Sequence, residues 1–187
     1  MKIWPLLLVL LAGCSGCVSV PSHTDLRATT LRLGFGSGLC SGTAISPDTL
    51  ITAQHCLALG GPLVTVNGQR VTVVGYGKDK RDTLTVRIKG LVFKHWARMG
   101  SPLHQGSRVR WFGNPAGERD IYREGYVVHA DSDEVLIDAQ AFGGDSGSGI
   151  FDDSGRLIGV LTGAKWWRSD NGLMFSLVVM YPIKLKA

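Results

Sequence analysis

The chain has 187 residues, of which 44% are hydrophobic and 19% charged, and this globular composition excludes disorder along the whole chain. The formal net charge is +5, but the basic residues are scattered, so the charge pattern gives no support to nucleic-acid binding. The 25 glycines occur among many short apolar runs, which favours tight turns and an all-β chain.

The N-terminal segment differs from the rest. Lys2 is followed by an apolar stretch, residues 3–11, which is too short to span a bilayer comfortably. It ends in Leu-Ala-Gly-Cys at Cys14, which resembles the lipobox of bacterial lipoproteins. The resemblance implies cleavage before Cys14 and lipid on its thiol. Two other interpretations of this segment remain open: an ordinary secretory signal that is cut slightly later, and an apolar start that arises by chance. Either signal would mean export to an oxidising compartment.

The four cysteines are Cys14, Cys17, Cys40 and Cys56. If Cys14 carries lipid, Cys40 and Cys56 are the natural pair, and Cys17 is left over, free or paired elsewhere.

The predicted signal peptide, residues 1–13, is followed by a polar tether, residues 14–30. Short strand-like runs then follow one another to the C-terminus. Gly, Asn, Asp and Pro occupy most of the gaps, and no long helical periodicity is present. The first set of strands predicts an N-terminal barrel over residues 31–93: 31–35, 42–45, 49–52, 63–66, 70–74 and 84–88. After a linker, residues 94–106, the second set predicts a C-terminal barrel over residues 107–187: 108–112, 122–129, 134–138, 157–161 and 174–180. Neither half alone buries much core, so we expect the two barrels to pack together.

The most informative segment is Gly-Gly-Asp-Ser-Gly-Ser-Gly at residues 143–149. A serine hydroxyl needs an adjacent base to act as a nucleophile, and it needs backbone N–H groups aimed at the developing oxyanion. Glycines on both sides of Ser146 allow the tight backbone that such a site requires. The same residues could also form an ordinary turn between two strands.

A second segment, Thr-Ala-Gln-His-Cys at residues 52–56, supplies a candidate base in His55. A disulfide between Cys40 and Cys56 would brace the turn beside this histidine. The other histidines, His23, His95, His104 and His129, show no partner pattern and are interpreted as surface or linker residues. Because no Cys/His cluster has zinc spacing, the sequence predicts neither a metal site nor a cofactor.

These segments resemble the histidine and serine motifs of trypsin-like serine proteases, with Gln54 where alanine is usual. The order His, Asp, Ser is that of the chymotrypsin group, and Cys40 and Cys56 match the disulfide beside the family's histidine. The resemblance covers the chain from about Leu31 onward. It implies an all-β fold of two six-stranded antiparallel barrels, with the active site in the cleft between them. The Gly-Asn-Pro-Ala-Gly turn at residues 113–117 is similar to one in HtrA-like bacterial proteases, although we expect no PDZ domain here.

The acid of the triad has two candidates, Asp82 and Asp79. Leu84, Val86 and Ile88 share one face of a strand, and Asp82 has the same parity. Asp79 lies between two lysines in a segment interpreted as a solvated turn. The sequence therefore favours Asp82.

The family's roles, carried over, make Ser146 the nucleophile, His55 the general base and acid, and Asp82 the group that orients the imidazole. The amides of Gly144 and Ser146 are expected to form the oxyanion hole, and Asp145 is expected to be structural.

Substrate contacts are also carried over from the family. Gln140 is expected at the floor of the specificity pocket, where trypsin-like enzymes that cut after Lys or Arg have aspartate. An uncharged amide disfavours a buried cation and predicts a medium apolar or polar uncharged residue before the scissile bond. Thr162, Gly163 and Ala164 are expected along one wall and Gly172 on the other side. A shifted loop that brings Asp138 inward would reverse this preference. Trp166 and Trp167 are expected in a loop. There they could line the rim of the substrate cleft, touch a membrane surface, or simply pack against the protein.

The leading functional hypothesis is an exported serine endopeptidase that cleaves proteins or peptides through an acyl-enzyme. We expect it to be lipid-anchored in a bacterial cell envelope, on the periplasmic or outer surface, with soluble secretion as the alternative. The rival hypothesis is a catalytically silent lipoprotein on the same fold that binds or masks a partner. No triad residue is missing, which favours the enzyme.

Overall fold

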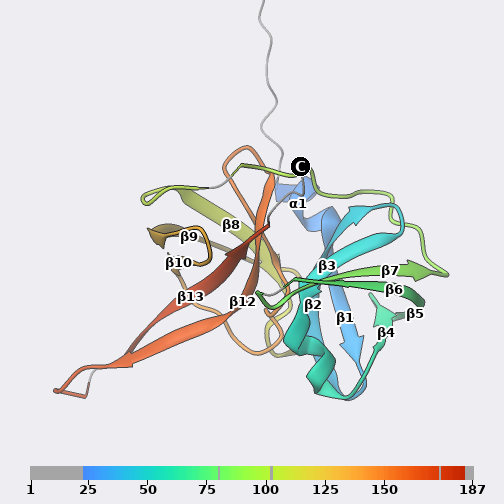
Figure 1. Ribbon diagram of the computed structural model, residues 1–187, viewed down its shortest axis with the longest axis horizontal. Coiled ribbons are helices and arrows are strands. Elements are labelled where there is room, and N and C mark those ends of the chain that lie inside the picture. Colours follow the sequence, from blue (N-terminus) through green and yellow to red (C-terminus); the bar gives the residue numbers. More distant parts are fainter. Residues whose placement is uncertain (1–22, 80, 102, 173, 184–187) are drawn as a thin grey trace, which may run out of the picture.

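The structure is a computed structural model that describes residues 23–79, 81–101, 103–172 and 174–183. The predicted signal peptide, Cys14 and Cys17 lie outside the described residues. Two β-units lie side by side, as Figure 1 shows, and the long hairpin of β12 and β13 extends away from the second unit. Among the described residues, no helix has the length and apolar character needed to cross a membrane.

The first unit is a seven-stranded antiparallel sheet with the order β5-β4-β1-β2-β3-β7-β6. Its elements are α1 (His23–Thr29), β1 (Thr30–Phe35), β2 (Gly38–Ser46), β3 (Thr49–Ala53), the 3-10 helix η1 (Gln54–Leu59), β4 (Leu63–Val66), β5 (Gln69–Arg70), β6 (Thr72–Lys78) and β7 (Thr83–Lys89).

The second unit is a closed six-stranded barrel with the order β10-β13-β12-β11-β8-β9. Its elements are β8 (Arg108–Gly113), the 3-10 helix η2 (Pro115–Gly117), β9 (Ile121–Ala130), β10 (Val135–Asp138), β11 (Gly149–Phe151), β12 (Leu157–Arg168) and β13 (Met174–Pro182).

The predicted all-β, two-barrel architecture is therefore confirmed, with differences in detail. The first unit is a half-barrel, because its edge strands β5 and β6 do not close the sheet. Part of the predicted tether is α1, whose Leu26 is buried and accepts hydrogen bonds from the hydroxyls of Thr29 and Thr30. Trp166 and Trp167 lie on β12 rather than in a loop, because β12 pairs with β13 as far as Arg168.

Each unit has its own apolar core, and a third cluster joins the two. Strand alternation sends residues such as Leu84, Val86 and Ile88 of β7 into the first core. The joining cluster contains Leu26, Ile51, Ala97, Phe112, Phe151, Leu157 and Val160. Burying a side chain of this size stabilises the fold by about 1.5–3 kcal/mol. The cluster therefore fixes how β3, which leads to His55, lies relative to the barrel that carries Ser146.

The described residues between β7 and β8 form no strand, but they bond to both units. Ala97 N–H donates to the carbonyl of Ala44 in β2, and Leu157 N–H of β12 donates to the carbonyl of Arg98. These bonds hold the connection against both units and reinforce the joining cluster.

Candidate active site

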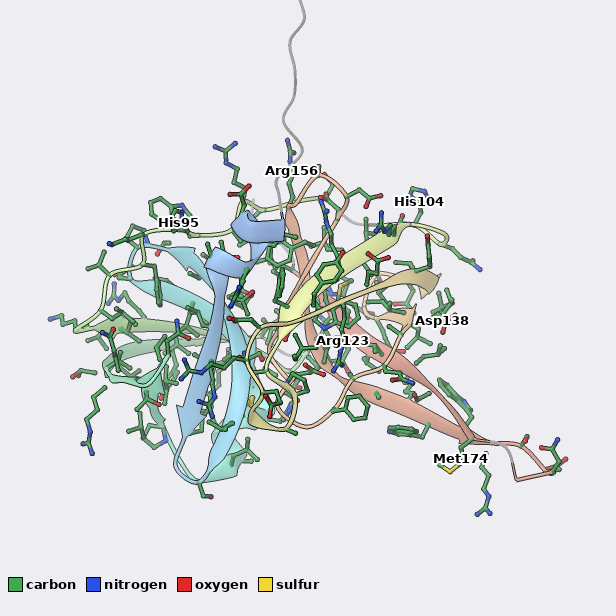
Figure 2. All side chains as sticks on the ribbon, turned by 180° about the vertical axis from the view of Figure 1, so that it is seen from behind. His95, His104, Arg123, Asp138, Arg156 and Met174 are labelled. Carbon is green, nitrogen blue, oxygen red and sulfur yellow. A yellow bond between two sulfur atoms is a disulfide. The ribbon has the colours of Figure 1, made fainter. Side chains whose placement is uncertain are left out.

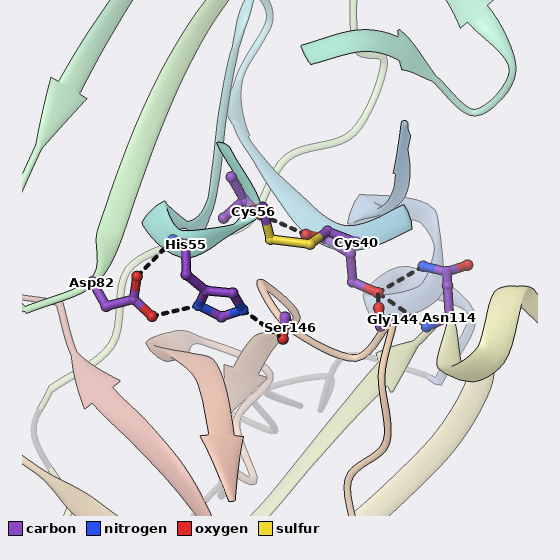
Figure 3. The surroundings of a disulfide bond; sticks show 9 residues. Cys40, His55, Cys56, Asp82, Asn114, Gly144 and Ser146 are labelled. Carbon is purple, nitrogen blue, oxygen red and sulfur yellow. Dashed lines mark hydrogen bonds and ion pairs between the residues drawn. A yellow bond between two sulfur atoms is a disulfide. The ribbon is translucent and has the colours of Figure 1, made fainter. Parts of the chain in front are cut away.

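His55 and Asp82 are brought together by the pairing of β3 with β7. Ala53, at the end of β3, lies opposite Thr83, at the start of β7, so the residues just beyond them meet. His55 N–H donates to Asp82 Oδ1 over 2.7 Å, and His55 Nδ1 lies 2.7 Å from Asp82 Oδ2. Gln54 N–H also donates to the carbonyl of Asp82. Both carboxylate oxygens of Asp82 therefore hold the histidine in a fixed orientation (Figure 3).

Asp82 lies outside the extended backbone of β7. Its φ of 59° is in the left-handed region, which side chains other than glycine adopt at a cost. Asp79, the alternative, instead accepts hydrogen bonds from the backbone and guanidinium of Arg81. The structure thus places Asp82, and not Asp79, beside His55.

Ser146 reaches the same histidine from the second barrel. His55 Nε2 lies 2.9 Å from Ser146 Oγ. The serine loop is anchored on both units, because Ser41 N–H of β2 donates to the carbonyl of Ser146 and Gly147 N–H donates to the carbonyl of Leu161 in β12. At Gly147, with φ of 90°, a Cβ would collide with β2 and β3, so only glycine fits this approach.

A disulfide between Cys40 and Cys56 braces the histidine turn, as predicted. Both cysteines are buried, and the bond joins η1 directly after His55 to β2 directly before Ser41. His55 and Ser41 are therefore tied to the same covalent link.

The amides of Gly144 and Ser146 have no hydrogen-bond acceptor among the described residues. The carbonyls beside them are held elsewhere. Ala116 N–H donates to the carbonyl of Gly143, and Ser41 Oγ donates to the carbonyl of Gly144 over 2.8 Å. The Gly143 carbonyl shares its peptide group with the Gly144 amide, and the Asp145 carbonyl, which shares its peptide group with the Ser146 amide, accepts from Ser148 N–H. Neither amide is used among the described residues, so both remain available to an anion.

Comparison with known proteins identifies the family. The family model of the trypsin-like peptidase domain matches residues 40–160. The chain belongs to this family. It is therefore a serine-type endopeptidase by family, and its substrates are proteins or peptides.

Solved structures share the fold at low sequence identity. An inactive mutant form of the Rv3671c protease of M. tuberculosis matches with a TM-score of 0.70 and 19% identity, over 88% of this chain and 86% of that one. A Glu endopeptidase matches with a TM-score of 0.64 and 15% identity, over 83% of this chain and 85% of that one. The MamO protease domain of Magnetospirillum magneticum matches with a TM-score of 0.65 and 17% identity, over 86% of this chain and 95% of that one.

This trypsin-like peptidase places an ion pair under its serine loop. Asp145 is fully buried, and its Oδ2 accepts hydrogen bonds from Phe142 N–H and from Arg123 Nη1 over 2.7 Å. Arg123, on β9 and labelled in Figure 2, also donates to the carbonyl of Gln140, and its guanidinium lies over the ring of Phe142. Burial raises the pKa of the Asp145 carboxyl above its usual range, although the Phe142 amide and Arg123 act in the opposite direction. Asp145 is thus structural, as predicted, and Arg123 is its partner.

Arg123→Gln should destabilise the protein by about 3–5 kcal/mol at neutral pH, because it leaves the buried Asp145 carboxylate without a cation. Loss of Arg123 would raise the Asp145 pKa further. When the folded-state pKa of a carboxyl lies above its unfolded value, protonation stabilises the fold at low pH, and this stabilisation is lost as the pH rises through the folded-state pKa. The defect should therefore be smaller at mildly acidic pH than at neutral pH. Urea unfolding of both proteins at two pH values measures this.

Arg108→Gln, which breaks the exposed pair with Glu124, is the matched control and should cost at most about 1 kcal/mol. Equal losses for the two variants, or a loss in Arg123→Gln that does not change with pH, would contradict the role given to this pair.

A hollow of about 310 Å³ opens beside Ser146. Its lining is Ala141, Phe142, Gly143, Ser146, Leu161, Gly163, Ala164 and Trp166. Of the residues predicted to contact substrate, Gly163 and Ala164 line it. Gln140 is exposed and lies just outside, and the Thr162 hydroxyl instead donates to a carbonyl of β13.

Gly172, also predicted to contact substrate, is not among the residues that line this hollow. Gly172 lies in the turn that joins β12 and β13, beyond Arg168, whereas the hollow ends near Trp166. The strand from Ala164 to Arg168 alone covers about 13 Å. Figure 2 shows Met174, on the returning strand, far out on this hairpin. The continuation of β12 past Leu161 is what carries Gly172 away.

Asp138 does not enter the hollow. Ile137, its neighbour on β10, is fully buried in the barrel, so strand alternation turns Asp138 outward, where it is exposed. No group of three or more His, Cys, Asp or Glu side chains among the described residues could hold a metal ion.

Proposed function

We propose that the chain is an active serine endopeptidase that uses Ser146, His55 and Asp82. The observation that carries the proposal is the continuous line of contacts from Asp82 Oδ2 to His55 Nδ1 and from His55 Nε2 to Ser146 Oγ. His55 Nε2 takes the hydroxyl proton as Ser146 Oγ attacks the scissile carbonyl carbon. The amides of Gly144 and Ser146 stabilise the oxyanion. His55 then gives the proton to the leaving amine, and water hydrolyses the acyl-enzyme by the same steps.

The rival function, a silent binding protein on this fold, predicts a serine that does not react. A fluorophosphonate probe modifies only an activated serine, so wild-type protein should take one label at Ser146 and a Ser146→Ala variant none. Labelling found by mass spectrometry at another serine, or no labelling of folded protein, would favour the binding protein.

We propose that the hollow beside Ser146 takes an apolar side chain. Its lining, as far as the structure describes it, includes no charged residue, and desolvating a Lys or Arg side chain there would go uncompensated. A Cβ added at Gly163 would meet nothing within 4 Å, so the wall at this position leaves open space. Phe142 and Trp166, each more than half exposed, flank the opening.

Digestion of a peptide library should therefore show cleavage after apolar residues. Gly163→Val should lower kcat/KM for large apolar residues by about 10-fold or more, since a lost methylene-sized contact is worth about 1–3 kcal/mol. Gly75→Val, on β6 in equally open space, is the matched control and should change nothing. Dominant cleavage after Arg and Lys that disappears in Asp138→Ala would show that the pocket has been assigned to the wrong residues.

We propose that the mature protein is anchored in a bacterial envelope through lipid on Cys14. The support is the sequence Leu-Ala-Gly-Cys after an apolar stretch. Fractionation should recover the protein with membranes, because several acyl chains hold more firmly than one. Cys14→Ser should release the protein or leave its precursor uncut, whereas Cys17→Ser should behave as wild type. A soluble wild-type protein whose N-terminus lies beyond Cys17 would instead indicate an ordinary secretory signal.

A further inference from the structure

A second hollow, of about 440 Å³, lies where α1 and β1 face the loop after η2. Its lining is Arg27, Ala28, Thr30, Arg32, Asn67, Asn114, Arg119 and Asp120. The lining residues include three arginines and one aspartate, which gives them a net charge of +2. None of these residues belongs to the triad or to the hollow beside Ser146.

Asp120 neutralises only one of the three arginines. Arg27 donates from Nε and Nη2 to the same oxygen, Asp120 Oδ2, over 3.0 and 2.8 Å. Arg32 and Arg119 make no ion pair with any residue that the structure describes. Arg32 Nε is buried and has no acceptor among these residues.

The backbone around the hollow is held firmly. Asn67 accepts a hydrogen bond from Arg32 N–H through Oδ1 and donates its own N–H to the carbonyl of Arg32. Asn67 and Asp120 both have left-handed backbones, with φ of 52° and 55°. At Asn67 this conformation is that of the Asn-Gly turn which joins β4 to β5. The backbone of Arg32 is therefore held in place by its two hydrogen bonds with Asn67.

We propose that this hollow binds an oxyanion of the phosphate or sulfate type. A phosphate carries nearly two negative charges at neutral pH and three strong acceptor oxygens, which matches the net charge of the lining. Guanidinium groups bind such oxygens in pairs of parallel hydrogen bonds. Arg119 and Arg32 supply guanidinium N–H donors that form no ion pair with a described carboxylate.

The bound anion would also act on the serine loop. Asn114, which lines the hollow, donates from its backbone N–H and from Nδ2 to Ser41 Oγ over 3.0 and 2.9 Å. Ser41 Oγ donates in turn to the carbonyl of Gly144, whose amide belongs to the proposed oxyanion hole. Asn114 and Gly144, both labelled in Figure 3, are thus joined through this hydroxyl. Both Nδ2 hydrogens of Asn114 are already used, on the Leu31 carbonyl and on Ser41 Oγ. An anion held by Arg32 and Arg119 therefore acts on the serine loop by holding β1 and the loop after η2 together around Asn114.

The test of binding is thermal unfolding in inorganic phosphate, with sodium chloride at equal ionic strength as the reference. At ten times Kd, phosphate should raise the Tm by about 3–6 °C, and the rise should saturate. Phosphate also stabilises proteins generally, without saturation. Arg119→Gln, at an exposed side chain, should therefore keep the general effect and lose the saturable one. Arg156→Gln, at an exposed arginine elsewhere, should keep both.

Sodium acetate, a carboxylate with one charge, should give a weaker effect than phosphate. Glycerol 3-phosphate and vesicles that contain phosphatidic acid, both phosphate monoesters, distinguish a free phosphate from one carried by a lipid when used in the same way. The proposal is overturned if phosphate matches sodium chloride, or if Arg119→Gln and wild type respond alike.

The coupling to Ser146 rests on the proposed function and has a separate readout. Saturating phosphate should speed fluorophosphonate labelling of Ser146 by about 5-fold in wild type and not in Arg119→Gln. A Tm rise without faster labelling would overturn the coupling and leave the anion site in place. A Tm rise in a protein that never labels would instead overturn the proposed function.

Discussion

Ser146→Ala is expected to reduce peptide hydrolysis by about a million-fold in kcat. The alanine has no oxygen to attack the scissile carbonyl, and no other hydroxyl among the described residues lies within hydrogen-bond distance of His55 Nε2. Some catalysis over the uncatalysed reaction should remain, because the substitution keeps both backbone amides of the proposed oxyanion hole. Steady-state kinetics on a peptide that is cleaved by wild type measures the loss.

His55→Ala should cause a loss of the same size, and the double variant should be no worse than either single one. Residues that act on one proton transfer are strongly non-additive, because removing either already removes the covalent pathway. Thermal unfolding controls for the fold. The Ser146 side chain is bonded only to His55 among the described residues, so Ser146→Ala should keep its Tm. Near-normal turnover in either variant would contradict the triad assignment.

Local pattern was sufficient for most strands, but not for elements whose formation depends on the other unit. β11 has only three residues, pairs with β8 at a single position, and has no alternation to detect. α1 forms because Leu26 packs into the cluster that joins the two units, and its sequence has too few apolar residues to show a helical period. The half-barrel could not be foreseen either, since closure depends on how two edge strands end.

The site was predictable where its residues follow one another in the chain. Cys40, His55, Cys56 and Ser146 are carried by contiguous motifs, and the structure brings them together as expected. The preference for Asp82 was right about which residue meets His55, but the reason was incomplete. Parity along β7 does not extend to a residue with a left-handed backbone, and the two bonds to His55 are what orient the carboxylate.

Supporting residues were not predictable, because they act from distant parts of the chain. Ser41 is 103 residues from Gly144, whose carbonyl it holds, and Arg123 is 22 residues from Asp145. Asn114 belongs to the turn at residues 113–117 that resembles one in HtrA-like proteases, and nothing in the local sequence indicates its bonds to Ser41. A polar side chain that satisfies a distant backbone group leaves no periodic signal in the sequence.

Asp82→Asn is expected to lower kcat by about 10⁴-fold with little change in the fold. Asp82 now accepts from His55 N–H through Oδ1 and lies against His55 Nδ1 through Oδ2. An asparagine has only one side-chain oxygen. If that oxygen keeps the bond to the backbone N–H, its NH₂ group faces Nδ1 and requires Nδ1 to accept. The imidazole proton then sits on Nε2, toward Ser146, so the ring cannot take the hydroxyl proton.

Asp79→Asn provides the matched control for this tautomer argument, three residues away and with the same change of charge. The Asp79 carboxylate bonds to Arg81, so its variant should keep kcat within about threefold, as expected for a partly exposed ion pair. Kinetics of both variants on one peptide, with fluorophosphonate labelling rates, distinguishes the two carboxylates. Slow labelling in Asp82→Asn together with an unchanged Tm would show that the carboxylate acts through His55 and not through stability. The reverse pattern, a large loss in Asp79→Asn alone, would mean that the contacts of Asp82 with His55 are not those that catalysis requires.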